Sequence, residues 1–393
     1  MKNIFGRSQR LNHKIYIRRS PVFPYKGFCD KKFDLAEQKD NFCFTKNSVL
    51  NEEKKGEEGM NTNIPEKMTM KIVISENNMN IKACDVSVSN ETSFKSFRKD
   101  VMELTKFKLC VLNTTVALST YAYYSTSLHL LSDFLLFTGG TMCISMTSQV
   151  FNQIKEKLLD KKMRRTNNRP LPKQRMSDQT AMLIGGSLWA SSLVLYSFSC
   201  PHAILFSNAI VLLYIKAYTP MKRNSNTSMH IGALVGALPA LLGSYAATGD
   251  LFVESSLLLA GYIFAWQYPH FYGILYQNRE DYKIAGFNFI SNYEDKTYIA
   301  YIQMLLAMTV MLYILYRLYK SKDKIINDLC FFTYLAFYVK NLIPVLKFYS
   351  NPTKYAKQIR KDSYMPFLIV LFSFAYTSYY MRRKSLKEGR NSI

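Results

Sequence analysis

Acidic residues are absent from the first 29 positions of this 393-residue sequence, and no long apolar run occurs before residue 100. The missing apolar run excludes a secretory signal peptide, which needs an apolar core behind its basic start. An N-terminus with lysine and arginine but no acid is typical of an organelle transit peptide. We therefore predict a mitochondrial transit peptide over residues 1–30, with a generic basic tail as the alternative.

Paired cysteines are missing as well. None of the seven cysteines forms a CxxC pair, and four of them lie in or beside apolar segments, namely Cys110, Cys143, Cys200 and Cys330. This distribution argues against a zinc site and against a disulfide framework. We interpret these cysteines as small apolar residues within helices.

Apolar residues are scarce between residues 31 and 103, where Asn, Lys, Glu and Ser dominate, as in the run NEEKKGEEGMNTN. A stretch of this composition cannot bury enough apolar area to offset the entropy lost on ordering. We predict a polar, disordered extension over residues 31–103. At the other end of the chain, residues 383–393 are expected to form a short basic tail.

Between these ends, residues 104–382 alternate long apolar stretches with short charged loops. About 20 apolar residues are enough to cross the core of a bilayer, so we predict about nine transmembrane helices. The expected segments are residues 109–127, 128–150, 181–200, 203–217, 231–247, 256–275, 298–318, 325–346 and 365–381. The fold class predicted is all-α, a polytopic membrane protein built as a helix bundle.

Lysine and arginine gather in alternate loops. The loops after the second, fourth and eighth segments are basic, whereas those after the first, third and fifth contain neither residue. Basic loops favour the inner side of a membrane, so they indicate one common side, which is the matrix in a mitochondrion. The basic residues after the seventh segment and at the C-terminus do not follow this alternation.

The formal net charge of +23 would by itself permit nucleic-acid binding. The basic residues, however, lie in loops between hydrophobic segments rather than along one soluble surface. We therefore expect the lipid bilayer, and no nucleic acid, as the partner of this chain.

A polar run, NQIKEKLLDKKMRRTNNRPLP, follows the second apolar segment. On a helix its residues Asn152, Glu156 and Asp160 would form one stripe, because they are spaced four apart. Neighbouring acids on one helix face repel, and a divalent cation such as Mg²⁺ removes that cost by binding to their oxygens. The alternative is a solvated helix end, in which the surrounding lysines pair with the acids.

Arginines follow the acidic stripe within a few turns. Arg164, Arg165 and Arg169 can each present a fork of N–H groups to phosphate oxygens. Lys222 and Arg223, which follow a proline in the next basic loop, are further candidates for phosphate contact. The combination indicates a diphosphate site at a membrane surface.

A third polar group, WQYPHF, lies inside or at the edge of an apolar segment, where polar groups are expensive and usually functional. His270 in this group has three open roles: donating a proton, binding a metal, or satisfying a backbone carbonyl. Asp281 lies eleven residues beyond it. Asp281 is either a second carboxylate that faces the acidic stripe or a local partner of Arg279.

Together these stretches resemble the intramembrane UbiA-type prenyltransferase superfamily over about residues 104–380. The matching pieces are LTKFK, NQIKEKLLDKKMRRTNNRPLP, YTPMKR, and WQYPHF followed by EDY. Gln153 and Glu156 stand where many members of the superfamily have aspartate. That departure, like WQYPHF, resembles the haem-modifying branch and disfavours the quinone branch.

The resemblance implies a bundle of nine transmembrane helices around a central cavity. It implies transfer of a farnesyl group from farnesyl diphosphate to a vinyl group of haem B, with water adding, and Mg²⁺ as the cofactor. It assigns Asn152, Glu156, Asp160 and Asp281 to Mg²⁺ and catalysis, Arg165, Arg169, Lys222 and Arg223 to the diphosphate, and His270 to haem. His230 is a weaker haem candidate.

The resemblance also implies a multi-pass protein of the mitochondrial inner membrane, on the path to haem A for cytochrome c oxidase, with a downstream haem-modifying enzyme as a candidate partner. Two alternatives stay open. One is another intramembrane prenyltransferase with a quinone-type aromatic acceptor, and the other is a transporter or haem-handling membrane protein without catalysis.

Overall fold

The computed structural model describes residues 43–45, 69–71, 90–125, 131–322 and 324–391. The chain divides into two units, Met1–Ser89 and Asn90–Ile393. In the first unit, strands β1 (Cys43–Thr45) and β2 (Thr69–Lys71) form an antiparallel pair. The predicted transit peptide and most of the predicted polar extension lie outside the described residues.

All secondary-structure elements in the described residues of the second unit are helices, as the sequence predicted. Its helices are α1 (Asn90–Leu104), α2 (Phe107–Tyr124), α3 (Leu131–Asp160), α4 (Asp178–Ser199), α5 (His202–Leu212), the π-helix η1 (Leu213–Tyr218), α6 (Thr219–Asn224), α7 (Ser228–Thr248), α8 (Glu254–Gln277), α9 (Arg279–Ala285), the 3₁₀ turn η2 (Ile290–Asn292), α10 (Thr297–Tyr319), α11 (Asp328–Leu346), α12 (Pro352–Asp362) and α13 (Tyr364–Asn391).

Two boundaries differ from those drawn on the sequence. Helix α1 occupies Asn90–Leu104, within the stretch predicted to be disordered, and α13 continues to Asn391, past the predicted start of the basic tail. For α1 the reason is contact with the rest of the unit: its Asp100 and Leu104 are buried. The composition of the stretch predicted disorder because an average over many residues carries no information on the few residues that make long-range contacts.

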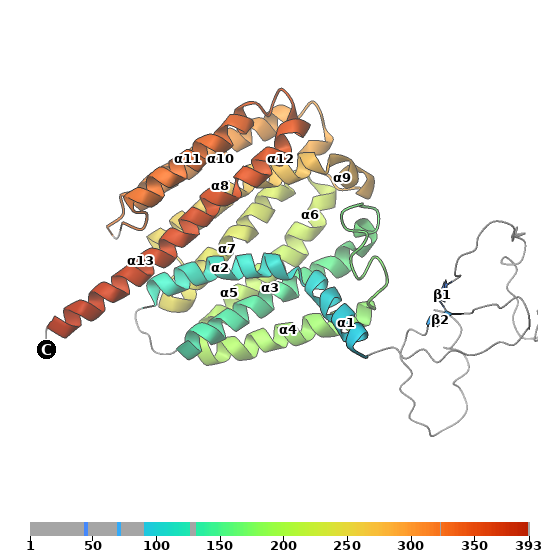
Figure 1. Cartoon of the computed structure of the whole chain (residues 1–393), viewed down its shortest axis with the longest axis horizontal. Helices are drawn as coiled ribbons and strands as arrows, with labels where there is room; N and C mark the ends of the chain where they lie inside the picture. Colours follow the sequence, from blue (N-terminus) through green and yellow to red (C-terminus); the bar gives the residue numbers. More distant parts are fainter. Residues whose placement is uncertain (1–42, 46–68, 72–89, 126–130, 323, 392–393) are drawn as a thin grey trace, which may run out of the picture. The chain divides into compact units, whose positions relative to one another are not determined.

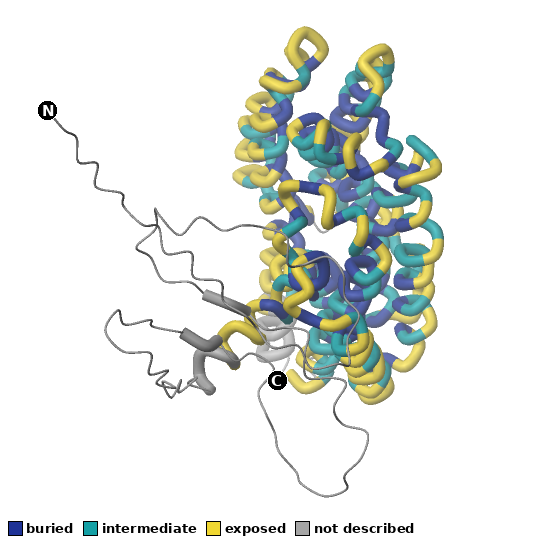
Figure 2. The backbone as a smooth tube through the Cα atoms, turned by 90° about the vertical axis from the view of Figure 1, so that its right-hand side faces the viewer, coloured by how far each residue is buried: buried dark blue, intermediate teal, exposed yellow. Residues whose placement is uncertain are grey.

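The long helices pack side by side as a bundle (Figure 1). Helix α3 packs along α4, α2 along α7, and α8 against α7, α10 and α12. The buried parts of the backbone face one another inside the bundle, while exposed parts lie on its outside and at its ends (Figure 2). The largest apolar core joins side chains of α7, α8, α10, α11 and α13.

Among the described residues, six helical stretches are long and apolar enough to cross a membrane. They are α3, α4, the continuous stretch His202–Asn224, α7, α10 and α11. The other three expected segments fall on α2, α8 and α13, in which serine, threonine or tyrosine interrupts the apolar sequence. The multi-pass helical fold is therefore confirmed, while the number of nine spans stays a prediction.

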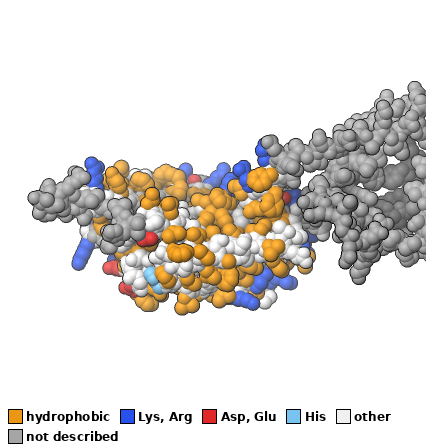
Figure 3. Space-filling view, turned by 90° about the horizontal axis from the view of Figure 1, so that it is seen from below, with side chains coloured by type: hydrophobic (Ala, Val, Ile, Leu, Met, Phe, Trp, Pro, Cys, Tyr) orange, Lys and Arg blue, Asp and Glu red, His pale blue; other side chains and the backbone are white. Residues whose placement is uncertain are grey.

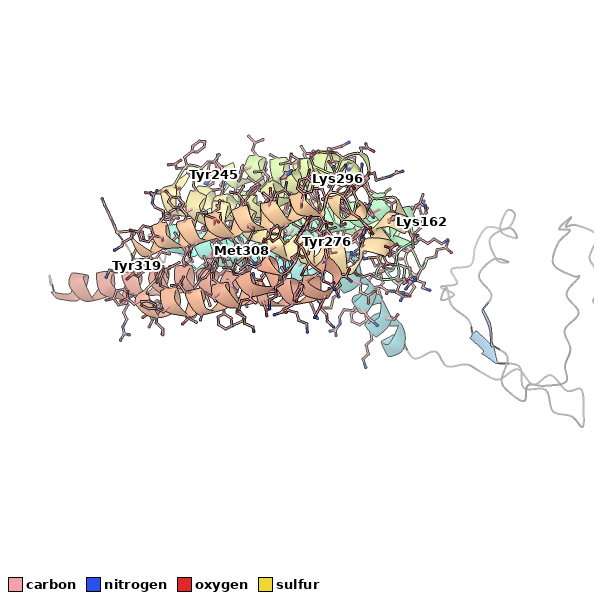
Figure 4. All side chains as sticks on the ribbon, turned by 90° about the horizontal axis from the view of Figure 1, so that it is seen from above. Lys162, Tyr245, Tyr276, Lys296, Met308 and Tyr319 are labelled. Atoms are coloured by element: carbon pink, nitrogen blue, oxygen red, sulfur yellow. The ribbon has the colours of Figure 1, made fainter. Side chains whose placement is uncertain are left out.

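The two ends of the bundle differ in their loops. Lys162 and Lys296 lie near one end, and Tyr245 and Tyr319 lie near the opposite end (Figure 4). We call the end with Lys162 and Lys296 the basic-loop end. Hydrophobic side chains cover most of the face between the two ends, and lysine and arginine lie mainly toward its margins (Figure 3). This distribution fits a protein whose middle lies in lipid.

Helices α2 and α7 approach closely because a small residue lies at their crossing. A Cβ added at Gly243 of α7 would overlap the carbonyl oxygen of Ala117 in α2. Near the same crossing, the Thr120 hydroxyl donates a hydrogen bond of 2.8 Å to the carbonyl of Ala240. Close packing at small residues and hydrogen bonds from hydroxyl groups of this kind hold membrane helices together.

Replacement of Gly243 by alanine should therefore lower stability. The Gly243→Ala variant forces α2 and α7 apart, and overpacking of this kind costs about 1–3 kcal/mol. The measurement is the apparent melting temperature in detergent. The matched control is Gly186→Ala in α4, where an added Cβ meets nothing within 4 Å. Equal melting of the two variants would show that the α2–α7 contact does not limit stability.

Candidate functional site

The polar stripe of α3 is buried at the basic-loop end. Asn152, Glu156 and Asp160 expose 0%, 6% and 3% of their surface. All three lie on one helix, so the predicted spacing is confirmed. Their burial excludes the alternative of a solvated helix end. In that alternative the acids would lie in water and pair with the neighbouring exposed lysines, whereas here they have almost no contact with water.

A lysine from a different helix neutralises the stripe. Lys222 of α6 donates to Glu156 Oε1 at 2.9 Å and to Asn152 Oδ1 at 3.4 Å. The Asn152 side-chain amide donates to Glu156 Oε2 at 2.9 Å, so both carboxylate oxygens have partners. Thr219 Oγ1 donates to Asn152 Oδ1 at 3.2 Å. Four polar side chains from two helices thus form one buried network.

A π-helix positions this lysine. The segment η1 lies between α5 and α6, and π-helical turns are frequent at functional sites. It turns two tyrosine rings toward Lys222, whose Nζ lies 4.5 Å from the ring centre of Tyr218 and 6.0 Å from that of Tyr214. The Tyr218 ring packs against Gly232 of α7, where an added Cβ would lie 2.6 Å from it. Aromatic faces attract a cation that has little contact with water.

A second lysine reaches the same region from the junction of α1 and α2. Lys106 has a left-handed backbone conformation, with φ of 48°. Its Nζ donates to Gln149 Oε1 at 3.0 Å, and the hydroxyl of Tyr214 donates to the same oxygen at 3.3 Å. Burial, together with the nearby positive charges of Arg169 and Lys222, lowers the pKa of Lys106 to about 7.

The segment 161–177, which we call the arginine loop, folds back over the end of α3. Arg169 forms an ion pair of 2.7 Å with Asp160 Oδ2, and Thr166 Oγ1 donates to the Asp160 carbonyl at 3.0 Å. The loop is anchored by Met163 and Leu171, which are buried. Arg169 therefore lies beside the acidic stripe, and its assignment to the diphosphate stays a prediction.

Asp281 lies on α9, on the other side of the arginine loop. The backbone N–H of Arg165 donates to Asp281 Oδ2 at 3.4 Å, and Arg164 Nε lies 4.0 Å from Asp281 Oδ1. The Arg165 guanidinium donates to the hydroxyl of Tyr282 at 2.9 Å. No contact among the described residues joins Asp281 to Glu156 or Asp160, so its place in a shared metal site stays a prediction.

Two further expectations can be compared with the geometry. Arg223 is exposed, and none of the hydrogen bonds or ion pairs of the described residues involves it. Among all residues that the structure describes, no three His, Cys, Asp or Glu side chains form a group able to hold a metal ion. The oxygen donors predicted for Mg²⁺ are instead an amide, Asn152, and two carboxylates that are each paired with a cation.

His270 lies in an aromatic group at the junction of α8, α12 and α13. Its ring stacks on Trp266 with centroids 4.7 Å apart, and Tyr364 meets it edge-on at 4.7 Å. Its Nδ1 lies 2.9 Å from Ser363 Oγ. No hydrogen bond within the described residues involves its Nε2. His230, the weaker candidate, instead has its Nδ1 bonded to the hydroxyl of Tyr268.

Reasoning from the sequence assigned no role to four residues of this network: Lys106, Gln149, Tyr214 and Thr219. One signal was available, because Gln149 continues the polar stripe one turn before Asn152. Tyr214, Tyr218 and Lys222 are also spaced four apart, like the acids of α3. The π-helix that brings Tyr214 to Gln149 and Thr219 to Asn152 has no comparable signature in the sequence.

Comparison with known proteins identifies the class. Residues 111–349 match the UbiA prenyltransferase family, and this match covers more than half of the chain. The chain belongs to the UbiA prenyltransferase family. The apo structure of a UbiA homologue from Aeropyrum pernix K1 superposes with a TM-score of 0.54 at 14% identity, covering 69% of this chain and 98% of that one. That likeness shows the shared fold.

Two relatives carry a more specific description. The protoheme IX farnesyltransferase of Flavobacterium psychrophilum is 37% identical over 198 residues, which are 49% of this chain and 65% of that protein. The mitochondrial protoheme IX farnesyltransferase of Neurospora crassa is 34% identical over 231 residues, 51% of this chain and 45% of that one. The chain thus spans less than two thirds of the length of either relative.

The buried ion pair makes a clear prediction about stability. In Lys222→Met, Glu156 stays buried without its cation, which costs roughly 3–5 kcal/mol. Adding Glu156→Gln to that variant removes the unpaired charge and should recover most of the loss. The measurement is the apparent melting temperature of the single and double variants.

The matched control is Arg223→Met, which removes the neighbouring exposed cation and should melt like the wild type. If Lys222→Met also melts like the wild type, the Glu156–Lys222 pair does not constrain the fold.

Proposed function

We propose that this chain transfers a farnesyl group from farnesyl diphosphate to a vinyl group of haem B. The observation that carries the proposal is the buried network of Asn152, Glu156 and Lys222, with Asp160 and Arg169 beside it, at one end of an apolar bundle. A network with both acids and cations suits a polyanion that is bound together with a metal ion. The acceptor is inferred from the relatives, which are described as protoheme IX farnesyltransferases.

Mg²⁺ fits the donors present. Asn152, Glu156 and Asp160 supply amide and carboxylate oxygens, the ligand types that Mg²⁺ prefers, and Asp281 lies on the opposite side of the arginine loop as a fourth donor. Bound there together with the substrate, Mg²⁺ would neutralise charge on the diphosphate oxygens.

The cations of the site have a direct role in bond cleavage. Lys222 and Arg169 now balance Glu156 and Asp160, and both can turn to diphosphate oxygens when the substrate enters. As the allylic C–O bond breaks, negative charge grows on the departing diphosphate, and fixed cations stabilise that charge. Arg165, whose guanidinium donates to the Tyr282 hydroxyl, is exposed on the same arginine loop as Arg169.

The acceptor step then consumes the farnesyl cation. A vinyl carbon of haem B forms the new C–C bond, water adds to the neighbouring carbon, and one proton is released. The farnesyl cation must not meet water first, so the reaction needs a dry surrounding. The apolar helices α3, α7 and α10 provide it. His270, whose Nε2 makes none of the described hydrogen bonds, is the candidate haem contact because imidazole is a common axial ligand.

The proposed location is the mitochondrial inner membrane, on the path to haem A for cytochrome c oxidase. Support comes from the mitochondrial relative and from the acid-free N-terminus. A downstream haem-modifying enzyme is the proposed consumer of the product. A quinone-type acceptor and a carrier without catalysis are the competing functions, and the assay below separates all three.

The direct test supplies membranes containing the chain with haem B, farnesyl diphosphate and Mg²⁺. The expected product is heavier than haem B by one farnesyl group plus water, as measured by mass spectrometry of extracted haem. Asp160→Asn should lower product formation by about 100-fold or more, because the charge that fixes Arg169 and the proposed metal is lost.

The control is Asp178→Asn, which removes an exposed acid paired with Lys157 by a 2.8 Å contact and should keep wild-type activity. Prenylation of an aromatic quinone precursor without any haem product would establish the competing acceptor. Folded protein with no prenylated product at all would refute a prenyltransferase.

Lys106 predicts a pH dependence of diphosphate binding. With a pKa of about 7 it is largely neutral above that pH, and a diphosphate nearby would raise its pKa. The contribution of Lys106 to binding is therefore complete below about pH 7 and is lost as the pH rises further. The measurement is the Kd of a non-hydrolysable farnesyl diphosphate analogue from about pH 6 to about pH 9.

The matched variant is Lys106→Arg, which keeps the positive charge but does not titrate in this range. Its Kd should change less with pH than that of the wild type. Ionisation of the ligand affects both proteins equally, because both are measured with the same ligand. Identical pH profiles of the two proteins would place Lys106 out of reach of the diphosphate.

A further inference from the structure

Helix α1 has two chemically different faces. Two of its acidic residues pair with the arginine loop: Arg175 of that loop lies 2.8 Å from Asp100 and 3.1 Å from Glu103. Its aromatic residues point outward, since Phe94 and Phe97 are 68% and 49% exposed. Arg98 and Lys99 are exposed beside these rings, so the outer surface of α1 combines aromatic side chains with positive charge.

The position of α1 is fixed by the polar end of α3. The side-chain amide of Gln153 donates to the carbonyl oxygens of Glu103 and Leu104, at 2.8 and 2.7 Å. These bonds satisfy two of the carbonyls that the last turn of a helix leaves unpaired. Helix α1 is therefore attached next to Asn152, at the basic-loop end.

A groove of about 710 Å³ lies where α1 meets the start of α2. Its lining is strongly basic, with Arg98 and Lys99 from α1 and Lys108 from α2. The acid in the lining, Glu103, is already paired with Arg175. The apolar part of the lining is Met102, Phe107 and Leu109, all exposed at the surface.

We propose that this groove binds the headgroup of an anionic phospholipid from the leaflet at the basic-loop end. The phosphate lies against Arg98, Lys99 and Lys108, and an acyl chain runs along Phe107 and Leu109 at the start of α2, one of the expected membrane segments. Basic residues next to apolar ones, at the start of a membrane helix, are the pattern that recognises anionic lipid.

A lipid explains the groove better than a free phosphate compound does. A small anion would satisfy the cations and leave Met102, Phe107 and Leu109 in contact with water. The ammonium of Lys106, at the inner edge of the groove, points instead to Gln149. The groove is therefore an outer site, separate from the buried network of Asn152, Glu156 and Lys222.

The first test is titration of the purified protein in detergent with phosphatidylglycerol or phosphatidylcholine, followed by native mass spectrometry. We expect tighter binding of phosphatidylglycerol. The triple variant Arg98→Gln, Lys99→Gln, Lys108→Gln should bind it at least about 10-fold more weakly, because it loses three of the positive charges that attract the headgroup.

The matched control removes three exposed cations elsewhere at the basic-loop end: Lys347→Gln, Lys354→Gln, Lys357→Gln. It should keep the wild-type affinity for phosphatidylglycerol. An equal loss in both triple variants would reduce the effect to total charge and overturn the proposal. So would complete displacement of the lipid by inorganic diphosphate, which would identify the groove as a site for free phosphate.

A second test does not depend on the folding of a triple variant. The photoreactive residue p-benzoylphenylalanine replaces Phe107 in the groove or, as a control, the exposed Phe252 before α8. After irradiation in bilayers of mixed phosphatidylglycerol and phosphatidylcholine, the adduct at position 107 should be enriched in phosphatidylglycerol, whereas the adduct at position 252 should reflect the mixture. The same lipid ratio at both positions would contradict a headgroup site.

Discussion

The buried pair of Glu156 and Lys222 is the interaction on which the rest of the site depends. Removing a carboxylate and an ammonium from water costs several kcal/mol for each ion, and their attraction offsets this only with good geometry and further hydrogen bonds. Here Asn152 supplies those bonds, at 2.9 Å to Glu156 and 3.4 Å from Lys222. Helices α3 and α6 must therefore meet in one register.

Several features of the fold follow from that requirement. The π-helix brings the Tyr218 ring to 4.5 Å from the Lys222 ammonium, and the arginine loop folds back so that Arg169 neutralises Asp160. Below about pH 7, Lys106 adds a positive charge from the start of α2. The site then contains more cations than acids, which suits a substrate with several negative charges. Its position at the end of an apolar bundle suits a substrate whose remainder is a hydrocarbon chain.

The sequence predicted the parts of this arrangement that are local. Residues spaced four apart on α3 form one stripe in any helix, so the positions of Asn152, Glu156 and Asp160 could be inferred directly. The π-helix could not, because it depends on how Tyr218 packs against Gly232 of α7. Helix α1 was missed for a related reason: it is stabilised by hydrogen bonds from Gln153 and ion pairs with Arg175, and both residues are distant from it in sequence. Asp281 shows the limit of spacing arguments, since its observed partners are in the arginine loop.

An experimental structure with a non-hydrolysable farnesyl diphosphate analogue and Mg²⁺ would test directly whether the Glu156–Lys222 pair forms the diphosphate site. We expect diphosphate density between Glu156 and Arg169, with the Lys222 ammonium turned from the carboxylate toward a phosphate oxygen. Diphosphate density elsewhere, with the Glu156–Lys222 pair unchanged, would reduce the buried network to a structural element of the bundle.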